Sequence, residues 1–77
     1  AKLSFNEDRE LKELPEKIEA LEAEQQSLYK TMSDPALYRQ GGQKASESKS
    51  RMEEIESRLE ASYRRWEELE AKKKASE

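Results

Sequence analysis

Residues 11–32 read LKELPEKIEALEAEQQSLYKTM, and the spacing of the apolar side chains in this stretch decides the fold. From Leu11 to Met32 the seam residues recur at alternating steps of three and four, and only Gln25 among them is polar. This spacing is the heptad seam of a coiled coil, with Leu11 at position a and Leu14 at position d. The stretch therefore predicts a long helix whose narrow apolar stripe needs a partner.

A second seam later in the chain supplies that partner. It comprises Ala45, Ser48, Met52, Ile55, Leu59, Ser62, Trp66 and Leu69. Between the seams, Asp34 before Pro35 is typical of the start of a short helix, and Gly41-Gly42 is typical of its end. A connection of this kind lets the second arm fold back on the first.

The fold class predicted is all-α, a two-helix antiparallel intramolecular coiled-coil hairpin in a single domain of residues 1–77. Arm one is expected at about residues 4–33, a loop with a short helical turn at 34–43, and arm two at about 44–74. Ser4 and Glu7 predict a capping box at the first helix start. Pro15 predicts a kink or a break in the first arm, because proline removes a helical hydrogen bond.

A turn centred on Gln40 aligns the two seams. This alignment pairs Leu11 with Leu69 and Leu21 with Leu59, and it places Trp66 in the core. Tyr29 and Tyr63, at e positions, are expected to be half exposed. On the flanks it sets Lys17 opposite Arg65, and Glu24 opposite Arg58.

Composition limits the possible functions. The 77 residues are 43% charged and 32% hydrophobic, with a mean hydropathy of -1.28. Cysteine and histidine are absent, and no nucleophile–base pair, phosphate loop or metal-ligand spacing occurs, so we expect no catalysis and no metal site. No apolar run is long enough to span a membrane. The net charge of -3 argues against a nucleic-acid binder overall, so the arrangement of charge matters more than its sum.

The g positions of the second arm are all basic: Arg51, Arg58, Arg65 and Lys72. Such a line of cations on one edge suits a phosphate backbone. An alternative is that these cations mainly support the helix, because Glu47, Glu54 and Glu68 precede three of them by four residues.

Arg65 lacks such a glutamate, so Lys17, Arg64 and Arg65 are the strongest candidates for an anion contact. The other predicted nucleic-acid-binding residues are Arg51, Arg58, Lys72, Lys73 and Lys74. At the hairpin tip we expect a partner contact through Leu37, Tyr38 and Arg39.

Several motifs carry a resemblance to a known family. They are K-L-S-F at 2–5, R-E-L at 9–11, L-P at 14–15, D-P-A-L-Y at 34–38 and R-W-E-E-L-E-A at 65–71. Together they resemble the C-terminal coiled-coil domain of ABC-F ATPases over nearly the whole chain.

The resemblance implies a domain that follows two tandem ATPase domains in a soluble, cytoplasmic bacterial protein. ATP and Mg²⁺ would bind to those domains, with no cofactor in this segment. In one branch of the family the C-terminal hairpin binds DNA and supports genome stability, whereas ABC-F proteins more broadly act on ribosomes.

Two functions therefore remain open: a DNA-binding module, and a structural arm that docks on the ribosome, another protein or the parent ATPase domains. Dimerisation through the seam is disfavoured by Gly41-Gly42, so a monomer is expected.

Overall fold

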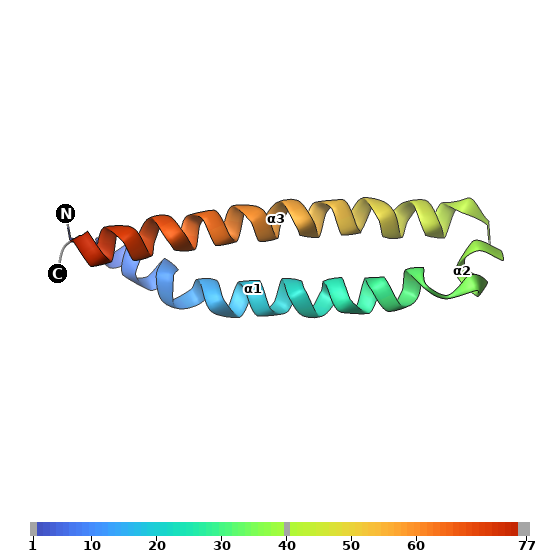
Figure 1. Cartoon of the computed structure of the whole chain (residues 1–77), viewed down its shortest axis with the longest axis horizontal. Coiled ribbons are helices and arrows are strands. Elements are labelled where there is room, and N and C mark those ends of the chain that lie inside the picture. The colour runs from blue at the N-terminus through green and yellow to red at the C-terminus, as the bar shows by residue number, and fades with distance from the viewer. Residues whose placement is uncertain (1, 40, 76–77) are drawn as a thin grey trace.

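The computed structural model describes residues 2–39 and 41–75, and of Tyr38 only the backbone. Within these ranges the chain forms α1 (Phe5–Met32), α2 (Pro35–Arg39) and α3 (Gly42–Ala75), and no strand. Helices α1 and α3 lie side by side and antiparallel in an elongated body of 56 × 16 × 15 Å (Figure 1). The start of α1 and the end of α3 meet at one end, called the open end, and α2 forms the tip. The predicted all-α helical hairpin is confirmed.

The start of α1 is fixed by the predicted capping box. The Glu7 backbone N–H donates to Ser4 Oγ at 3.1 Å, and the Ser4 backbone N–H donates to Glu7 Oε1 at 3.0 Å. Two of the N–H groups that lack a helical acceptor at a helix start are thereby satisfied.

Helix α1 continues through Pro15 without a break. Of the two predicted outcomes, the structure shows the kink, because the turns before Pro15 incline toward α3 (Figure 1). Proline has no N–H to donate to the Leu11 carbonyl, and its ring crowds that oxygen, which accounts for the bend.

The core consists of two apolar clusters along the seam. Near the open end, Leu11, Leu14 and Leu69 pack together with Leu3 against them. The second cluster holds Ile18, Ile55 and Leu59, with Leu21 and Leu28 packed on it. The predicted partners Leu11 and Leu69 therefore share one cluster, and Leu21 and Leu59 share the other.

Trp66 departs from the prediction. Its side chain was expected in the core, but the residue is 38% exposed. A two-helix seam is only one layer of side chains deep, so the large indole at an a position extends onto the edge of the hairpin. Tyr29 and Tyr63, 49% and 44% exposed, are half exposed as expected.

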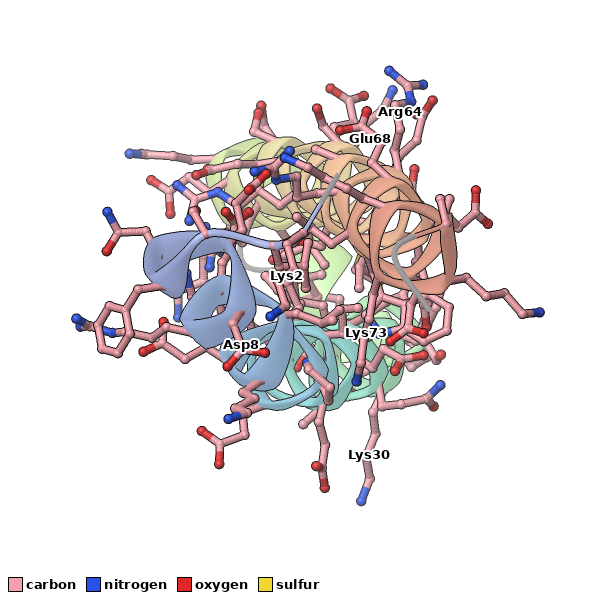
Figure 2. The ribbon with its side chains drawn as sticks, turned by 90° about the vertical axis from the view of Figure 1, so that its left-hand side faces the viewer. Lys2, Asp8, Lys30, Arg64, Glu68 and Lys73 are labelled. Atoms are coloured by element: carbon pink, nitrogen blue, oxygen red, sulfur yellow. The ribbon has the colours of Figure 1, made fainter. Side chains whose placement is uncertain are left out.

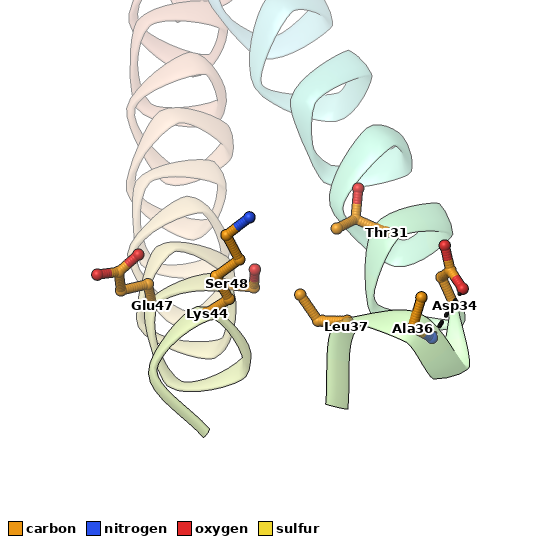
Figure 3. A pocket seen from close by; sticks show the side chains of 7 residues that line it. All are labelled: Thr31, Asp34, Ala36, Leu37, Lys44, Glu47 and Ser48. Carbon is orange, nitrogen blue, oxygen red and sulfur yellow. Dashed lines mark hydrogen bonds between the residues drawn. The ribbon is translucent and has the colours of Figure 1, made fainter. Parts of the chain in front are cut away.

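The tip is closed by Leu37. Asp34 Oδ1 accepts from the Ala36 N–H at 2.9 Å and caps α2, and Gly41 adopts φ +100° where the chain turns into α3. The Leu37 side chain points between the arms toward α3 (Figure 3), where it is 8% exposed beside a hollow of about 290 Å³. Gln40, on which the turn was centred, lies outside the described residues.

Candidate nucleic-acid interface

One edge of the hairpin collects the g positions of both arms, and we call it the g edge. In a coiled coil the g position lies beside d, so the g residues of antiparallel arms meet on the same side. The members of the g edge are Glu10, Lys17 and Glu24 from α1, and Arg51, Arg58, Arg65 and Lys72 from α3.

Three of the four basic residues on this edge are held by carboxylates of α1. Arg51 makes a two-pronged contact with Glu24, in which Nη2 lies 2.6 Å from Oε1. Arg65 contacts Glu10 in the same way, with Nε 2.7 Å from Oε2 and Nη2 3.1 Å from Oε1. These side chains clamp α1 to α3.

Lys72 completes the series at the open end. Its Nζ lies 2.8 and 2.9 Å from the two carboxylate oxygens of Glu7. Glu7 thus serves both the capping box and a contact between the arms.

Two predicted flank pairings are wrong. Arg65 was expected opposite Lys17, yet it pairs with Glu10 and also contacts Glu68 at 3.3 Å. Glu24 was expected opposite Arg58; its ion pair is with Arg51, and Arg58 acts on it through its charge alone. Each g residue has two diagonal neighbours one heptad apart, and the diagonal that joins opposite charges is the one occupied.

These contacts change the acidity of the carboxyl groups. The hydrogen bond from Lys72, followed by the Ser4 backbone N–H, lowers the pKa of Glu7 from 4.5 to about 2. Arg65 lowers the pKa of Glu10, and Arg51 lowers that of Glu24, in both cases chiefly by hydrogen bonding.

A dependence of stability on acid pH follows. A carboxyl group whose pKa is lower in the folded chain stabilises the fold above its ordinary pKa, and this contribution is lost as the pH falls through the folded value. We expect the melting temperature to fall as the pH drops from 4.5 to about 2, where Glu7 becomes protonated. In Glu7→Gln the melting temperature should be lower at neutral pH and its decline with acid shallower.

Glu16→Gln is the matched control for this experiment. Glu16 is exposed on α1 and takes part in no ion pair among the described residues. If Glu7→Gln and Glu16→Gln decline with the same slope, the contact between Lys72 and Glu7 does not stabilise the fold.

The centre of the g edge differs from its two ends. The diagonal that pairs Glu10 with Arg65 and Glu24 with Arg51 leaves Lys17 and Arg58, two cations, on either side of one hollow. They stand at the rim of a groove of about 560 Å³, the central groove. Its lining residues are Lys17, Ala20, Leu21, Arg58, Ala61 and Ser62.

Neither cation of the central groove forms an ion pair between the arms in the described part of the chain, although the charge of Lys17 acts on Glu10 and that of Arg58 acts on Glu24. Lys17 takes part in none of the ion pairs formed within residues 2–39 and 41–75. Arg58 reaches only Glu54 of its own helix, at 2.8 Å, a carboxylate that Arg51 also contacts, and the Arg58 side chain is 60% exposed. The groove is therefore the positively charged part of the g edge.

The remaining predicted residues lie away from the groove. Arg64 projects outward from α3 (Figure 2), pairs with Glu60 at 2.9 Å and is 69% exposed, so it does not share an edge with Arg65. Lys73 and Lys74 are exposed at the end of α3. At the tip Arg39 is exposed, Leu37 is buried and unavailable to a partner, and the Tyr38 side chain lies outside the described part.

Sequence reasoning did not find the groove floor. The heptad positions could have revealed this floor, because Ala20 and Ala61 occupy c positions and Ser62 occupies a d position. All three are small residues on the g side of their helices.

No group of three or more acidic, histidine or cysteine side chains in the described part could hold a metal ion. No described helix is long and apolar enough to cross a membrane.

Comparison with known proteins decides the family. Residues 2–71 match the family model described as the ABC transporter C-terminal domain. The chain belongs to this family. The resemblance to the C-terminal domain of ABC-F ATPases is thereby confirmed, and the relatives place this ABC transporter C-terminal domain with Uup.

Two similar proteins come from Haemophilus influenzae. This ABC transporter C-terminal domain is 39% identical over 72 residues to the "ATP-binding protein Uup-like", covering 94% of the chain and 16% of the relative. The "ATP-binding protein Uup" of that organism is also 39% identical over 72 residues, covering 94% of the chain and 11% of the relative.

The Escherichia coli "ATP-binding protein Uup" is 36% identical over 73 residues, covering 95% of the chain and 12% of the relative. The chain thus spans less than a fifth of the length of these relatives. No solved structure matches it significantly.

Proposed function

We propose that this ABC transporter C-terminal domain binds DNA through the phosphate backbone, with Lys17 and Arg58 at the centre of the contact. The observation that carries the proposal is that these two cations, from different helices, line one groove, and neither forms an ion pair with a carboxylate of the other arm among the described residues. Phosphate groups are attracted to such a site without regard to base sequence.

The shape of the central groove supports a phosphate ligand. Ala20, Ala61 and Ser62 have short side chains, so a sugar–phosphate strand can approach the helices while Lys17 and Arg58 reach it from both sides. The guanidinium of Arg58 can donate two parallel hydrogen bonds to one phosphate.

The other basic residues have different parts in this proposal. Arg51 and Arg65 hold the arms together and so shape the groove between them. Lys73 and Lys74, exposed at the end of α3 and off the g edge, add positive charge near the open end. The likeness to Uup-type hairpins favours DNA as the nucleic acid, and the net charge of -3 implies weak binding that salt weakens further.

Reversal of the two groove charges tests the proposal. Fluorescence anisotropy near 50 mM salt measures the affinity for a mixed-sequence DNA duplex. We expect Lys17→Glu/Arg58→Glu to lower this affinity about tenfold. Affinity of the unchanged chain should fall steeply between about 50 and 200 mM salt, and the double variant should have a log–log slope shallower by about 2.

Lys30→Glu/Lys49→Glu is the matched control. Lys30 and Lys49 are exposed, lie off the g edge, and give the same change in net charge. If both double variants weaken binding equally, the groove is not the contact. Single-stranded DNA and structured RNA titrated in parallel would reveal a preference other than duplex DNA.

The observed ion pairs also favour a second candidate, an interaction arm that docks on the ribosome or on the parent ATPase domains. Three cations of the g edge already contact carboxylates of α1. These ion pairs stabilise the hairpin, and they leave fewer cations available to bind a nucleic acid. This candidate predicts no measurable binding to DNA and no effect of the groove variants.

ATP binding and hydrolysis, with Mg²⁺, are assigned in this proposal to the remainder of a longer cytoplasmic protein. The relatives are named ATP-binding proteins, and the segment they share with this chain is a small part of each. The 77 residues contain no glycine-rich phosphate loop.

A further inference from the structure

The edge opposite the central groove has a different chemistry. Here the e positions of the two arms meet, and we call it the e edge. Tyr63 of α3 lies beside Glu22 of α1: partial burial, followed by the charge of this carboxylate and a hydrogen bond with it, raises the pKa of Tyr63.

Three aromatic rings are exposed along the e edge. Tyr63 is 44% exposed, Trp66 follows one turn later at 38%, and Tyr29 lies two turns beyond Glu22 on α1 at 49%. An a position borders the e position on a coiled-coil helix, so Trp66 belongs to this edge and not to the g edge. Exposed rings that line one side of a small protein mark an interaction surface.

The charge around these rings has one sign over residues 15–29 of α1 and 53–70 of α3, and Lys49, Lys73 and Lys74 lie just beyond the ends of the α3 segment. From Pro15 to Tyr29 on α1, and from Glu53 to Glu70 on α3, the e positions and the neighbouring b positions contain no lysine or arginine. The acidic side chains there are Glu19, Glu22, Glu53, Glu56, Glu60, Glu67 and Glu70. Within the described residues only Glu60 pairs with a cation, Arg64, whereas the g-edge carboxylates are all paired.

We infer that the e edge is a docking surface for an arginine-rich protein segment. Guanidinium groups stack on tyrosine and tryptophan rings and form two-pronged bonds with carboxylates, and this edge offers both alternately. The negative charge repels nucleic acid, so this surface and the proposed DNA contact occupy opposite edges of one hairpin. The inference does not depend on the proposed function.

The test uses the 77-residue chain and a peptide of alternating Arg and Ser, with Trp66, the single tryptophan, as the fluorescent reporter. We expect the peptide to change the Trp66 emission, and the same peptide with Lys for Arg to bind more weakly. Glu56→Gln/Glu70→Gln should weaken the binding of the Arg peptide about fivefold, because two carboxylate contacts are lost.

Glu16→Gln/Glu47→Gln is the matched control, because both residues are exposed, lie off the e edge and give the same change in net charge. It should retain nearly full affinity. Trp66→Leu, which keeps an apolar seam residue, should weaken binding roughly threefold by calorimetry with unchanged helix content.

Equal losses in the two double variants would overturn the inference, since the peptide would then be attracted by net charge alone. So would full affinity in Trp66→Leu together with equal binding of the Arg and Lys peptides, because the rings would then contribute nothing.

Discussion

Replacing Ile55 with alanine is expected to reduce the free energy of unfolding by about 3 kcal/mol. Ile55 is 0% exposed in the cluster that joins Ile18 and Leu59, and it is one of two fully buried side chains identified in the described part. A seam one layer deep has few neighbours that can move in to fill the cavity. Because small domains are stable by only about 5 kcal/mol, the variant should retain about 2 kcal/mol and unfold at a much lower urea concentration.

Urea denaturation followed by far-UV circular dichroism measures this loss. Ile55→Val is the matched control and should cost about 1 kcal/mol, because it removes one methyl group from the same place. Leu28→Ala, at a partly buried seam position, should fall between the two. An Ile55→Ala chain as stable as Ile55→Val would contradict the packing of the central cluster.

Replacing Pro15 with alanine is expected to have the second-largest effect, a gain of about 2 kcal/mol in the free energy of unfolding. Pro15 is exposed, so alanine leaves no cavity, and the new N–H can donate to the Leu11 carbonyl. The gain should be less than the full penalty for proline in a helix, since α1 has already adapted by bending.

Thermal and urea denaturation check this gain, with Glu16→Ala as the control at the neighbouring exposed position. That control should change stability by no more than about 0.5 kcal/mol. A Pro15→Ala chain that is less stable than the parent would show that the bend itself is needed, because it holds Leu11 and Leu14 against Leu69.

Much of the fold could be predicted from the sequence because local rules and the seam agree. The heptad spacing identified Leu11, Leu14 and Ile18 as core residues, and all three are buried. Ser4 and Glu7 formed the capping box as expected, since both partners of that motif lie within one turn. Periodicity and capping depend on neighbours in sequence, which a single chain displays fully.

The candidate site was less predictable because it depends on which diagonal each long side chain takes. Heptad letters place Lys17 and Arg65 on the same edge, but they do not say which residue of the other arm a guanidinium will reach. The choice of Glu10 over Lys17 as the partner of Arg65 moved the unbalanced charge to Lys17 and Arg58. Charge alternation along the g positions of α1 contained this information.

Side-chain size caused the remaining differences. Trp66 satisfies the apolar pattern but exceeds the depth of a two-helix seam, so it became a surface ring. Leu37 was expected both to close the seam and to meet a partner, and its burial allows only the first. The heptad spacing predicts which side of the helix a side chain faces. It does not predict whether the seam between the helices is deep enough to bury that side chain.

The meeting of both helix ends at one side of a body 56 Å long has a mechanical consequence (Figure 1). A partner that holds the open end contacts the ends of both α1 and α3 (Figure 1), so a rotation applied there turns the two helices together. The displacement grows in proportion to the distance from the open end. The ion pairs between α1 and α3 oppose sliding of one helix along the other. A small rotation of the open end would therefore displace the tip, at the far end of a body 56 Å long, much farther than the residues beside the open end.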